Sequence, residues 1–181
     1  MIAYVRIPKT ASCTILKAVG SQVVSKDHEP IEFYTGAAAT FTFVRNPWER
    51  LHSWYRHAGY FQHRSFEEYV TGEETHPMHP VAPTQRYRHG NANETDMLVA
   101  DQADWFRYRQ PTFIGRFENL AQDLVCIGDM LGFNVKAVPH ENRNTRMGPE
   151  TYSPDLWTPK MLEIMAPIFE PFAEQFGYES P

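Results

Sequence analysis

A short polar stretch rich in hydrogen-bond donors lies near the N-terminus, between a β-branched run and an amphipathic segment. It reads Pro8-Lys9-Thr10-Ala11-Ser12-Cys13-Thr14. A loop between a strand and a helix presents free backbone N–H groups and the positive end of the helix dipole, which favour a phosphate. Lys9 adds a mobile positive charge, and the hydroxyls of Thr10, Ser12 and Thr14 add donors. The glycines and GK[ST] ending of a Walker A loop are missing, so the stretch indicates another kind of anion loop or an ordinary polar turn.

A second candidate for anion binding follows the β-branched and aromatic run 41–44. Arg45 comes directly after that run, and open α/β sheets bind ligands at the carboxyl ends of their strands. The segment 46–49 then predicts a helix start, with Asn at the cap, Pro at the first helical position and Glu three residues after the cap. Ser53 lies about two turns into this helix and meets the same anion if Arg45 reaches back along it. The alternative is an Arg45–carboxylate pair and an ordinary helical serine.

Together and in this order, the two segments closely resemble the nucleotide-binding loops of sulfotransferases that use 3′-phosphoadenosine 5′-phosphosulfate (PAPS). The nearer relatives are the carbohydrate sulfotransferases, including the heparan and chondroitin enzymes and their shorter bacterial and phage relatives. The stretch 7–14 is similar to the family's 5′-phosphosulfate loop, and 43–53 is similar to its 3′-phosphate segment. Further similarity lies in 114–120, in 142–144 and in the tail 176–178, so the resemblance spans nearly the whole chain.

The resemblance implies a role for each matched residue. Lys9 contacts the 5′-phosphosulfate and assists the leaving group, while Arg45 and Ser53 hold the 3′-phosphate. The rest of the first loop lines the same site: Pro8, Thr10, Ala11, Ser12, Cys13 and Thr14. The chain departs from the family at Cys13, where serine or threonine is usual, and at Ala11, which replaces a frequent glycine. The chain is also short for the family, which implies trimmed acceptor-binding elements.

The implied activity is transfer of a sulfuryl group from PAPS to a hydroxyl, with a saccharide as the acceptor that the resemblance favours. Such a transfer is analogous to phosphoryl transfer, where the protein mainly positions the reactants and stabilises the leaving group. The acceptor hydroxyl also needs a base within hydrogen-bond reach. His28 is the first choice, because it falls between the two cofactor segments, where the resembling enzymes place a histidine or glutamate, and histidine titrates near neutral pH. Glu29 and Glu32 are the alternatives.

Other polar residues carry weaker signals. His76 and His79 lie among prolines, but no third ligand at metal spacing accompanies them, so we expect no metal. Arg116 either holds the sheet edge or approaches the nucleotide. Arg143 and Arg146 either bind phosphate or an acidic acceptor, or lie on the solvated surface, which is the usual place for arginine.

The elements that must position these residues alternate between strands and helices. Short β-branched and aromatic runs predict strands at 2–7, 41–44 and 112–115. Apolar periodicity and capping residues predict helices over about 12–24, 46–59, 95–109 and 118–131, a short one from Ser65, and one from 158 that Pro167 and Pro171 kink or divide. This order predicts an α/β fold with a mostly parallel sheet. With the resemblance, the expectation is a P-loop-like, three-layer fold whose small central sheet is flanked by helices.

Composition predicts one soluble domain over residues 1–181, because 42% hydrophobic and 14% aromatic residues suffice for a core. A net charge of −5 argues against a general nucleic-acid binder. Two cysteines, the lack of a signal-peptide pattern and the lack of an apolar run of about 20 residues predict a cytoplasmic protein without a membrane span. Oligomeric state is left open. Two other functions are a nucleotide kinase, disfavoured by the missing Walker loop, and a non-catalytic nucleotide-binding module.

Overall fold

The computed structural model describes residues 1–72, 101–138 and 151–181. These residues fall into two compact units, each assembled from separate stretches of the chain. The first unit holds residues 1–45 and 102–138, and the second holds 46–72, 101 and 151–181. The expectation of a single domain over 1–181 stays a prediction.

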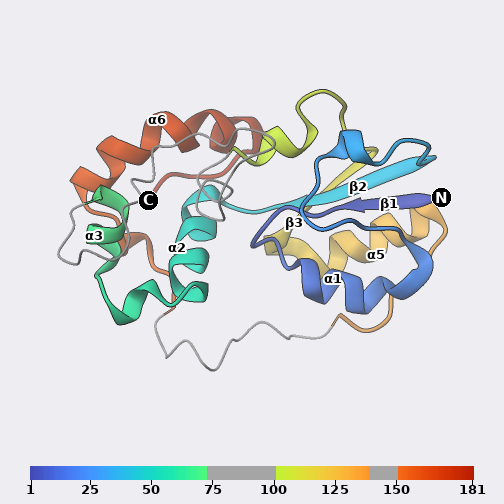
Figure 1. The fold of residues 1–181 in the computed structure, drawn as a ribbon, viewed down its shortest axis with the longest axis horizontal. Coiled ribbons are helices and arrows are strands. Elements are labelled where there is room, and N and C mark those ends of the chain that lie inside the picture. The colour runs from blue at the N-terminus through green and yellow to red at the C-terminus, as the bar shows by residue number, and fades with distance from the viewer. Residues whose placement is uncertain (73–100, 139–150) are drawn as a thin grey trace. The chain divides into compact units, whose positions relative to one another are not determined.

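A three-stranded parallel sheet is the centre of the first unit (Figure 1). Its strands are β1 (Ile2–Val5), β2 (Ala39–Val44) and β3 (Phe113–Arg116), in the order β1-β2-β3. In this register Tyr4 lies opposite Phe41, which lies opposite Phe113. The predicted α/β class with a small parallel sheet is therefore confirmed, and each strand begins and ends within two residues of its expected position.

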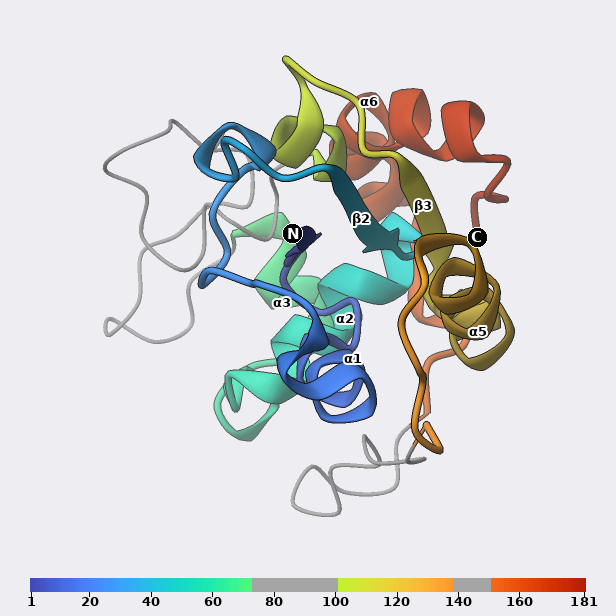
Figure 2. The ribbon, with the colours of Figure 1, turned by 90° about the vertical axis from the view of Figure 1, so that its right-hand side faces the viewer.

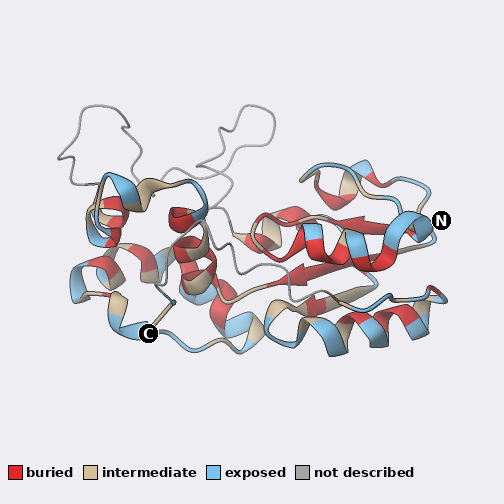
Figure 3. Cartoon of the chain, turned by 90° about the horizontal axis from the view of Figure 1, so that it is seen from below, coloured by how far each residue is buried: buried red, intermediate tan, exposed pale blue. Residues whose placement is uncertain are grey.

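The helices α1 (Ser12–Val19) and α5 (Leu120–Leu131) lie on one side of this sheet, as Figures 1 and 2 both show. Large apolar side chains from the strands meet the apolar faces of both helices. Strands β1 and β2 are almost wholly buried, whereas β3 is buried only at Gly115 and half-buried elsewhere (Figure 3). The two 3₁₀ turns η2 (Ile31–Phe33) and η4 (Gln102–Phe106) lie on the other side and pack against each other. The core on the helix side comprises Tyr4, Ile15, Ala18, Val19, Val23, Phe41, Phe43, Leu124, Ile127 and Phe133.

The first helix is shorter than the predicted 12–24. It ends at Val19 because Gly20 takes a positive φ of 59°, and the 3₁₀ turn η1 (Gly20–Gln22) follows. Val24 is extended and bridges to β1: Tyr4 N donates to Val24 O, and Val24 N donates to Ile2 O, both at 2.9 Å. Valine continues the apolar period of the helix, so the pattern alone could not show this change to an extended conformation.

The helix predicted over 95–109 is wrong in its described part. Residues 101–109 contain only η4, which is five residues long, and residues 95–100 lie outside the described residues. Gln102, Trp105 and Phe106 are all buried, so tertiary contacts of these side chains override the helical period. The helix α5, in contrast, follows a short turn η5 (Phe117–Asn119) and ends at Leu131 as predicted, with Gly132 as its C-cap.

The described residues of the second unit form three helices: α2 (Pro47–His57), α3 (Phe66–Thr71) and α6 (Pro159–Phe176). Asn46 Oδ1 accepts from the backbone N–H groups of Trp48 and Glu49, which confirms the predicted cap of α2. Ser65 caps α3 in the predicted capping box. Two short turns, η3 (Tyr60–Gln62) and η7 (Pro154–Leu156), complete the unit. No helix in the described part of the chain is long and apolar enough to cross a membrane.

The prolines of α6 do not divide it, contrary to one form of the prediction. Pro167 and Pro171 are four residues apart and both are exposed, whereas Met161, Met165 and Phe169 face the core of the unit. The two carbonyls that lose an intrahelical donor, those of residues 163 and 167, therefore belong to the exposed side, where water can satisfy them. The buried face keeps the helix continuous.

Candidate functional site

The connection between β1 and α1 holds two non-glycine residues in the left-handed region. Lys9 has φ 68°, and Ala11 has φ 65° and ψ 29°. Such a backbone costs about 1–2 kcal/mol per residue and persists only where the surroundings hold it, commonly at ligand sites. Ala11 is followed directly by the right-handed first residue of α1, and such a left–right pair turns successive N–H groups toward one concave side. The loop thus has the backbone form of an anion-binding nest.

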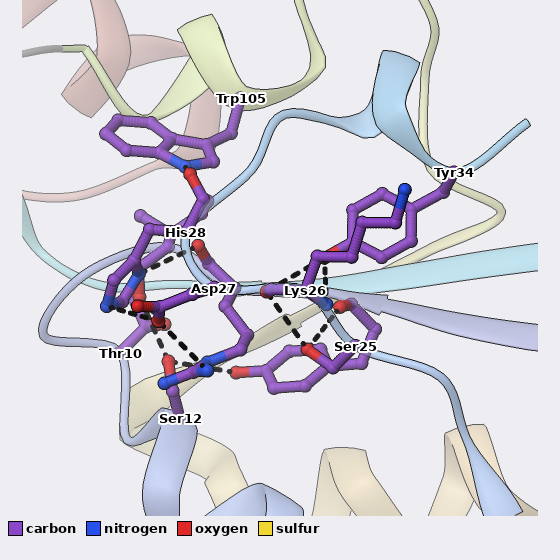
Figure 4. Close-up of polar contacts among 11 residues, drawn as sticks. Thr10, Ser12, Ser25, Lys26, Asp27, His28, Tyr34 and Trp105 are labelled. Carbon is purple, nitrogen blue, oxygen red and sulfur yellow. Dashed lines mark hydrogen bonds and ion pairs between the residues drawn. The ribbon is translucent and has the colours of Figure 1, made fainter.

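Two hydroxyls of the loop hold this backbone in shape. Thr10 Oγ1 donates to Ile7 O at 2.9 Å, and Ser12 Oγ donates to the same carbonyl at 3.2 Å. Tyr4 OH donates in turn to Ser12 Oγ at 3.4 Å (Figure 4). Because a hydroxyl has one proton, the protons of Thr10 and Ser12 are engaged within the loop, so donation to an anion would fall to the backbone N–H groups. Direct donation from Thr10 and Ser12 to a ligand stays a prediction.

The remaining loop residues differ in exposure. Pro8 and Thr14 are buried, whereas Cys13 is exposed on the first turn of α1. The Cys13 thiol is therefore on the outer surface of the helix start. Its contribution to a cofactor site stays a prediction.

Lys9 and Arg45 bring two cations together at this loop. Arg45 Nη1 donates to Lys9 O at 3.4 Å, and the Arg45 guanidinium stacks on the Phe117 ring with its Cζ 4.0 Å from the ring centroid. Burial and then the nearby Arg45 charge lower the pKa of the Lys9 amine to about 8. Within the described part of the chain, no carboxylate forms an ion pair with Lys9. An anion bound here would stabilise the protonated Lys9 amine and the Arg45 guanidinium.

Arg45 lies directly after the last residue of β2, as the sequence predicted. It therefore stands at the carboxyl edge of the sheet, where the β1–α1 loop also begins. Ser53 is a half-buried residue of α2 and belongs to the second unit. Its joint action with Arg45 stays a prediction.

His28 is held on a strained backbone with φ 38°. Its Nδ1 lies 3.2 Å from Arg6 O, and a carbonyl only accepts, so the neutral ring carries its proton on Nδ1 and its lone pair on Nε2. Nε2 lies 3.7 Å from Asp27 Oδ1, and Asp27 also pairs with Arg6 Nη1 at 3.1 Å (Figure 4). This arrangement suits a base that takes a proton on Nε2 and is then stabilised by a carboxylate.

The alternative bases lie on the same stretch of chain. Glu29 follows His28 and is half-buried, and Glu32 belongs to η2. Glu32 Oε1 is buried, and among the described residues it has no hydrogen-bond partner. All three side chains stay candidates for the base.

Sequence reasoning gave neither Gln102 nor Trp105 a part in the site. Gln102 bonds to the backbone of Arg45, and Trp105 Nε1 donates to the carbonyl of His28. These contacts join residues that are 57 and 77 positions apart along the chain, so no local pattern reports them.

Several residues weighed in the sequence fall outside the described part of the structure: His76, His79, Arg143 and Arg146, together with the segment 142–144. Arg116 N donates to Asp123 Oδ2 at 2.7 Å, which ties the end of β3 to α5. In residues 1–72, 101–138 and 151–181, no group of three or more His, Cys, Asp or Glu side chains could hold a metal ion.

Comparisons with protein-family models, with curated proteins and with solved structures found no match to this chain. What is known of the site therefore comes from its own residues and their geometry.

Proposed function

We propose that this protein is a PAPS-dependent sulfotransferase with a P-loop-like fold, which transfers a sulfuryl group to a hydroxyl of an acceptor, with a saccharide favoured. The observation that carries the proposal is the loop between β1 and α1. There the non-glycine residues Lys9 and Ala11 adopt the left-handed backbone of an anion nest, and Lys9 is half-buried beside Arg45. Two cations and converging N–H groups at the carboxyl edge of a parallel sheet suit a nucleotide with more than one phosphate.

Each group of the site has a distinct part in binding. The loop N–H groups and Lys9 hold the 5′-phosphosulfate, and Arg45 holds the 3′-phosphate. A guanidinium suits this task because its planar set of donors matches phosphate oxygens in pairs. Its contact with the Phe117 ring and the bond from Nη1 to Lys9 O hold the guanidinium beside the loop. The part of Ser53 in holding the same phosphate rests on the resemblance.

The transfer is an in-line displacement at sulfur. The acceptor oxygen forms a bond to sulfur while the bond from sulfur to the bridging phosphate oxygen breaks. The hydroxyl proton goes to His28 Nε2, and the electron pair of the broken bond stays on the phosphate. Lys9 and the loop N–H groups stabilise the charge that develops there, which is a preorganised electrostatic contribution. The released nucleotide is adenosine 3′,5′-bisphosphate.

Thermal unfolding with and without adenosine 3′,5′-bisphosphate tests the cofactor class, with ATP and adenosine 5′-monophosphate as controls. A ligand at 100 times its Kd stabilises the native state by about 2.7 kcal/mol. For a chain of this size that raises Tm by about 5–10 °C. A rise specific to the 3′-phosphorylated nucleotide supports the proposal, and no rise, or an equal rise with ATP, contradicts it.

Turnover of labelled PAPS with a panel of hydroxyl-bearing acceptors, saccharides first, tests the reaction. Label transfer to an acceptor supports an enzyme. Nucleotide binding without transfer to any member of the panel would favour the non-catalytic module, which shares the nucleotide site and lacks the acceptor site. Phosphoryl transfer from ATP would instead indicate a kinase.

A further inference from the structure

We propose that η4 is the positioning element of this site, in which Gln102 fixes Arg45 for nucleotide binding and Trp105 fixes His28 for proton transfer. The inference rests on the proposed function, because the roles of Arg45 and His28 come from it. It assigns a task to two residues that the chemistry itself does not use.

Gln102 grips the backbone of Arg45 with both ends of its side-chain amide. Gln102 Oε1 accepts from Arg45 N at 2.9 Å, and Gln102 Nε2 donates to Arg45 O at 2.7 Å. The side chain therefore acts as a strand partner at the point where β2 has ended and the ladder no longer supplies one. Gln102 is 1% exposed, so both bonds are shielded from water. A fixed peptide at Arg45 sets the direction in which its side chain leaves the sheet.

Trp105 holds the backbone of His28, the proposed base, which has a positive φ. Its indole Nε1 donates to His28 O at 2.9 Å (Figure 4), and the ring is 1% exposed. His28 has a positive φ, which a non-glycine residue keeps only when its surroundings fix it. The carbonyl is held by Trp105 and the ring is held by Arg6 O at Nδ1, so backbone and imidazole are fixed from two sides.

The two contacts come from one turn. Gln102 and Trp105 are three residues apart in η4. Shortly after η4, Arg109 Nη2 donates to Ile31 O at 2.9 Å, which ties this part of the chain to η2, three residues beyond His28. A single turn thus fixes the backbone of Arg45, which binds the nucleotide, and the backbone of His28, which acts on the acceptor. Catalytic groups displaced by about 1 Å commonly lose 10²-fold in rate, so such a turn matters to both tasks.

The Gln102 part is tested with Gln102→Met, which keeps the length of the side chain and removes both hydrogen bonds. We expect its Kd for adenosine 3′,5′-bisphosphate to rise about tenfold, with kcat at saturating PAPS within about twofold of wild type. In an Arg45→Ala background the same change should add nothing to Kd. An unchanged Kd in the single variant, or an equal rise in both backgrounds, overturns the assignment.

Gln22→Met is the matched control. Gln22 makes the same two-ended amide contact to Asn134, with Oε1 accepting from Asn134 N at 2.9 Å and Nε2 donating to Asn134 O at 2.7 Å. We expect this variant to keep the wild-type Kd. If Gln102→Met does not fold, Gln102→Glu keeps the acceptor and loses the donor, and its Kd then decides by the same criterion.

The Trp105 part is tested with Trp105→Phe, which keeps an aromatic ring and removes the donor. We expect kcat to fall about tenfold with the nucleotide Kd unchanged, and no further fall in a His28→Ala background. The control is Tyr55→Phe, which also removes a buried aromatic donor from a backbone carbonyl, that of Arg64 at 2.6 Å, and should keep kcat. A loss that adds to His28→Ala, or a change in Kd alone, overturns the assignment.

Failure of this inference is distinguishable from failure of the proposed function. Wild-type binding of adenosine 3′,5′-bisphosphate and wild-type turnover of PAPS test the function. With both present, only the separate responses of Kd and kcat in the variants test η4.

Discussion

Lys9 is a half-buried cation beside a second cation, and burial together with the Arg45 charge lowers the pKa of its amine to about 8. A bound phosphate or sulfate would favour the protonated amine. Lys9→Met should therefore weaken binding of adenosine 3′,5′-bisphosphate by at least about tenfold, since a charge-assisted hydrogen bond contributes about 1.5–3 kcal/mol. It should also reduce PAPS turnover strongly. Isothermal titration and a radiolabel assay measure the two effects.

Lys17→Met is the control for that variant, because Lys17 is an exposed residue of α1 and the change in net charge is the same. Wild-type affinity should also fall between pH 7 and pH 9.5, as Lys9 loses its proton, and the Lys9→Met protein should lack this fall. Equal affinity of Lys9→Met and wild type would remove Lys9 from the mechanism.

The same amine predicts how stability without ligand depends on pH. Its pKa is about 8 in the folded protein, against the ordinary lysine value of 10.5 in the unfolded chain, so between these values the unfolded state binds more protons. The free energy of unfolding should then rise by about 1–2 kcal/mol from pH 7.5 to pH 9.5. Burial raises the pKa of Tyr4 and Tyr34, which has the opposite effect only above their ordinary value of 10. Urea unfolding of wild type and Lys9→Met, in which the rise should be absent, checks this.

The base is tested at the residue scale as well. His28→Ala should lower kcat about 10²-fold or more and leave the Kd for adenosine 3′,5′-bisphosphate unchanged, because in the proposed mechanism His28 acts on the acceptor proton and not on the nucleotide. Glu29→Gln and Glu32→Gln are measured beside it under the same conditions. A large loss in either glutamate variant, with His28→Ala near wild type, would move the base to that glutamate.

At the scale of elements, Gly115 of β3 is the register partner of Phe43 in β2, and its missing side chain leaves room for the Phe43 ring. A Cβ atom there would lie 2.4 Å from Cε1 of the buried Phe43 ring. Gly115→Ala should therefore cost about 1–3 kcal/mol of stability through overpacking, measured by urea unfolding. In a Phe43→Leu background the ring is gone and the cost should shrink. An equal cost in both backgrounds would mean that another contact is responsible.

The sequence predicted the elements whose cause is local and missed those whose cause is distant. Nearby residue types determine the strands, the Asn46 cap of α2 and the end of α5 before Gly132. They also determine the positions of Lys9 and Arg45 at the edge of the sheet. They do not determine the 3₁₀ form of η4, because it depends on the bonds of Gln102 and Trp105 to residues far away in the chain. The end of the first helix was missed because Val24 fits both a helical period and a strand.

At the scale of the whole molecule, each of the two units is formed from two separate stretches of the chain, and these stretches alternate along the sequence. Residues 46–72 of the second unit separate β2 from η4 and β3 of the first. No single cut therefore yields both units intact, and a chain that ended at residue 72 would lack β3, α5 and the turn that holds Arg45. The candidate site depends on η4, which follows residues 46–101 of the second unit along the chain. For this reason the site could not be predicted from the two N-terminal motifs alone.

Charge at this scale predicts which anions bind. The chain carries a net charge of −5, whereas Lys9 and Arg45 form a local cationic site. In the proposed site a mononucleotide meets these two cations alone, whereas a polyanion longer than the site also meets the net negative charge of the rest of the chain. At 0.1 M salt, charges closer than the Debye length of about 10 Å are only partly screened. We therefore expect adenosine 3′,5′-bisphosphate to bind at 0.1 M salt, and a labelled single-stranded DNA of about 20 nucleotides to show no change in fluorescence anisotropy. Unlabelled DNA should also fail to displace the bisphosphate. Displacement that is lost in Lys9→Met would show instead that the same two cations accept a nucleic-acid backbone, and would contradict a site selective for a free nucleotide.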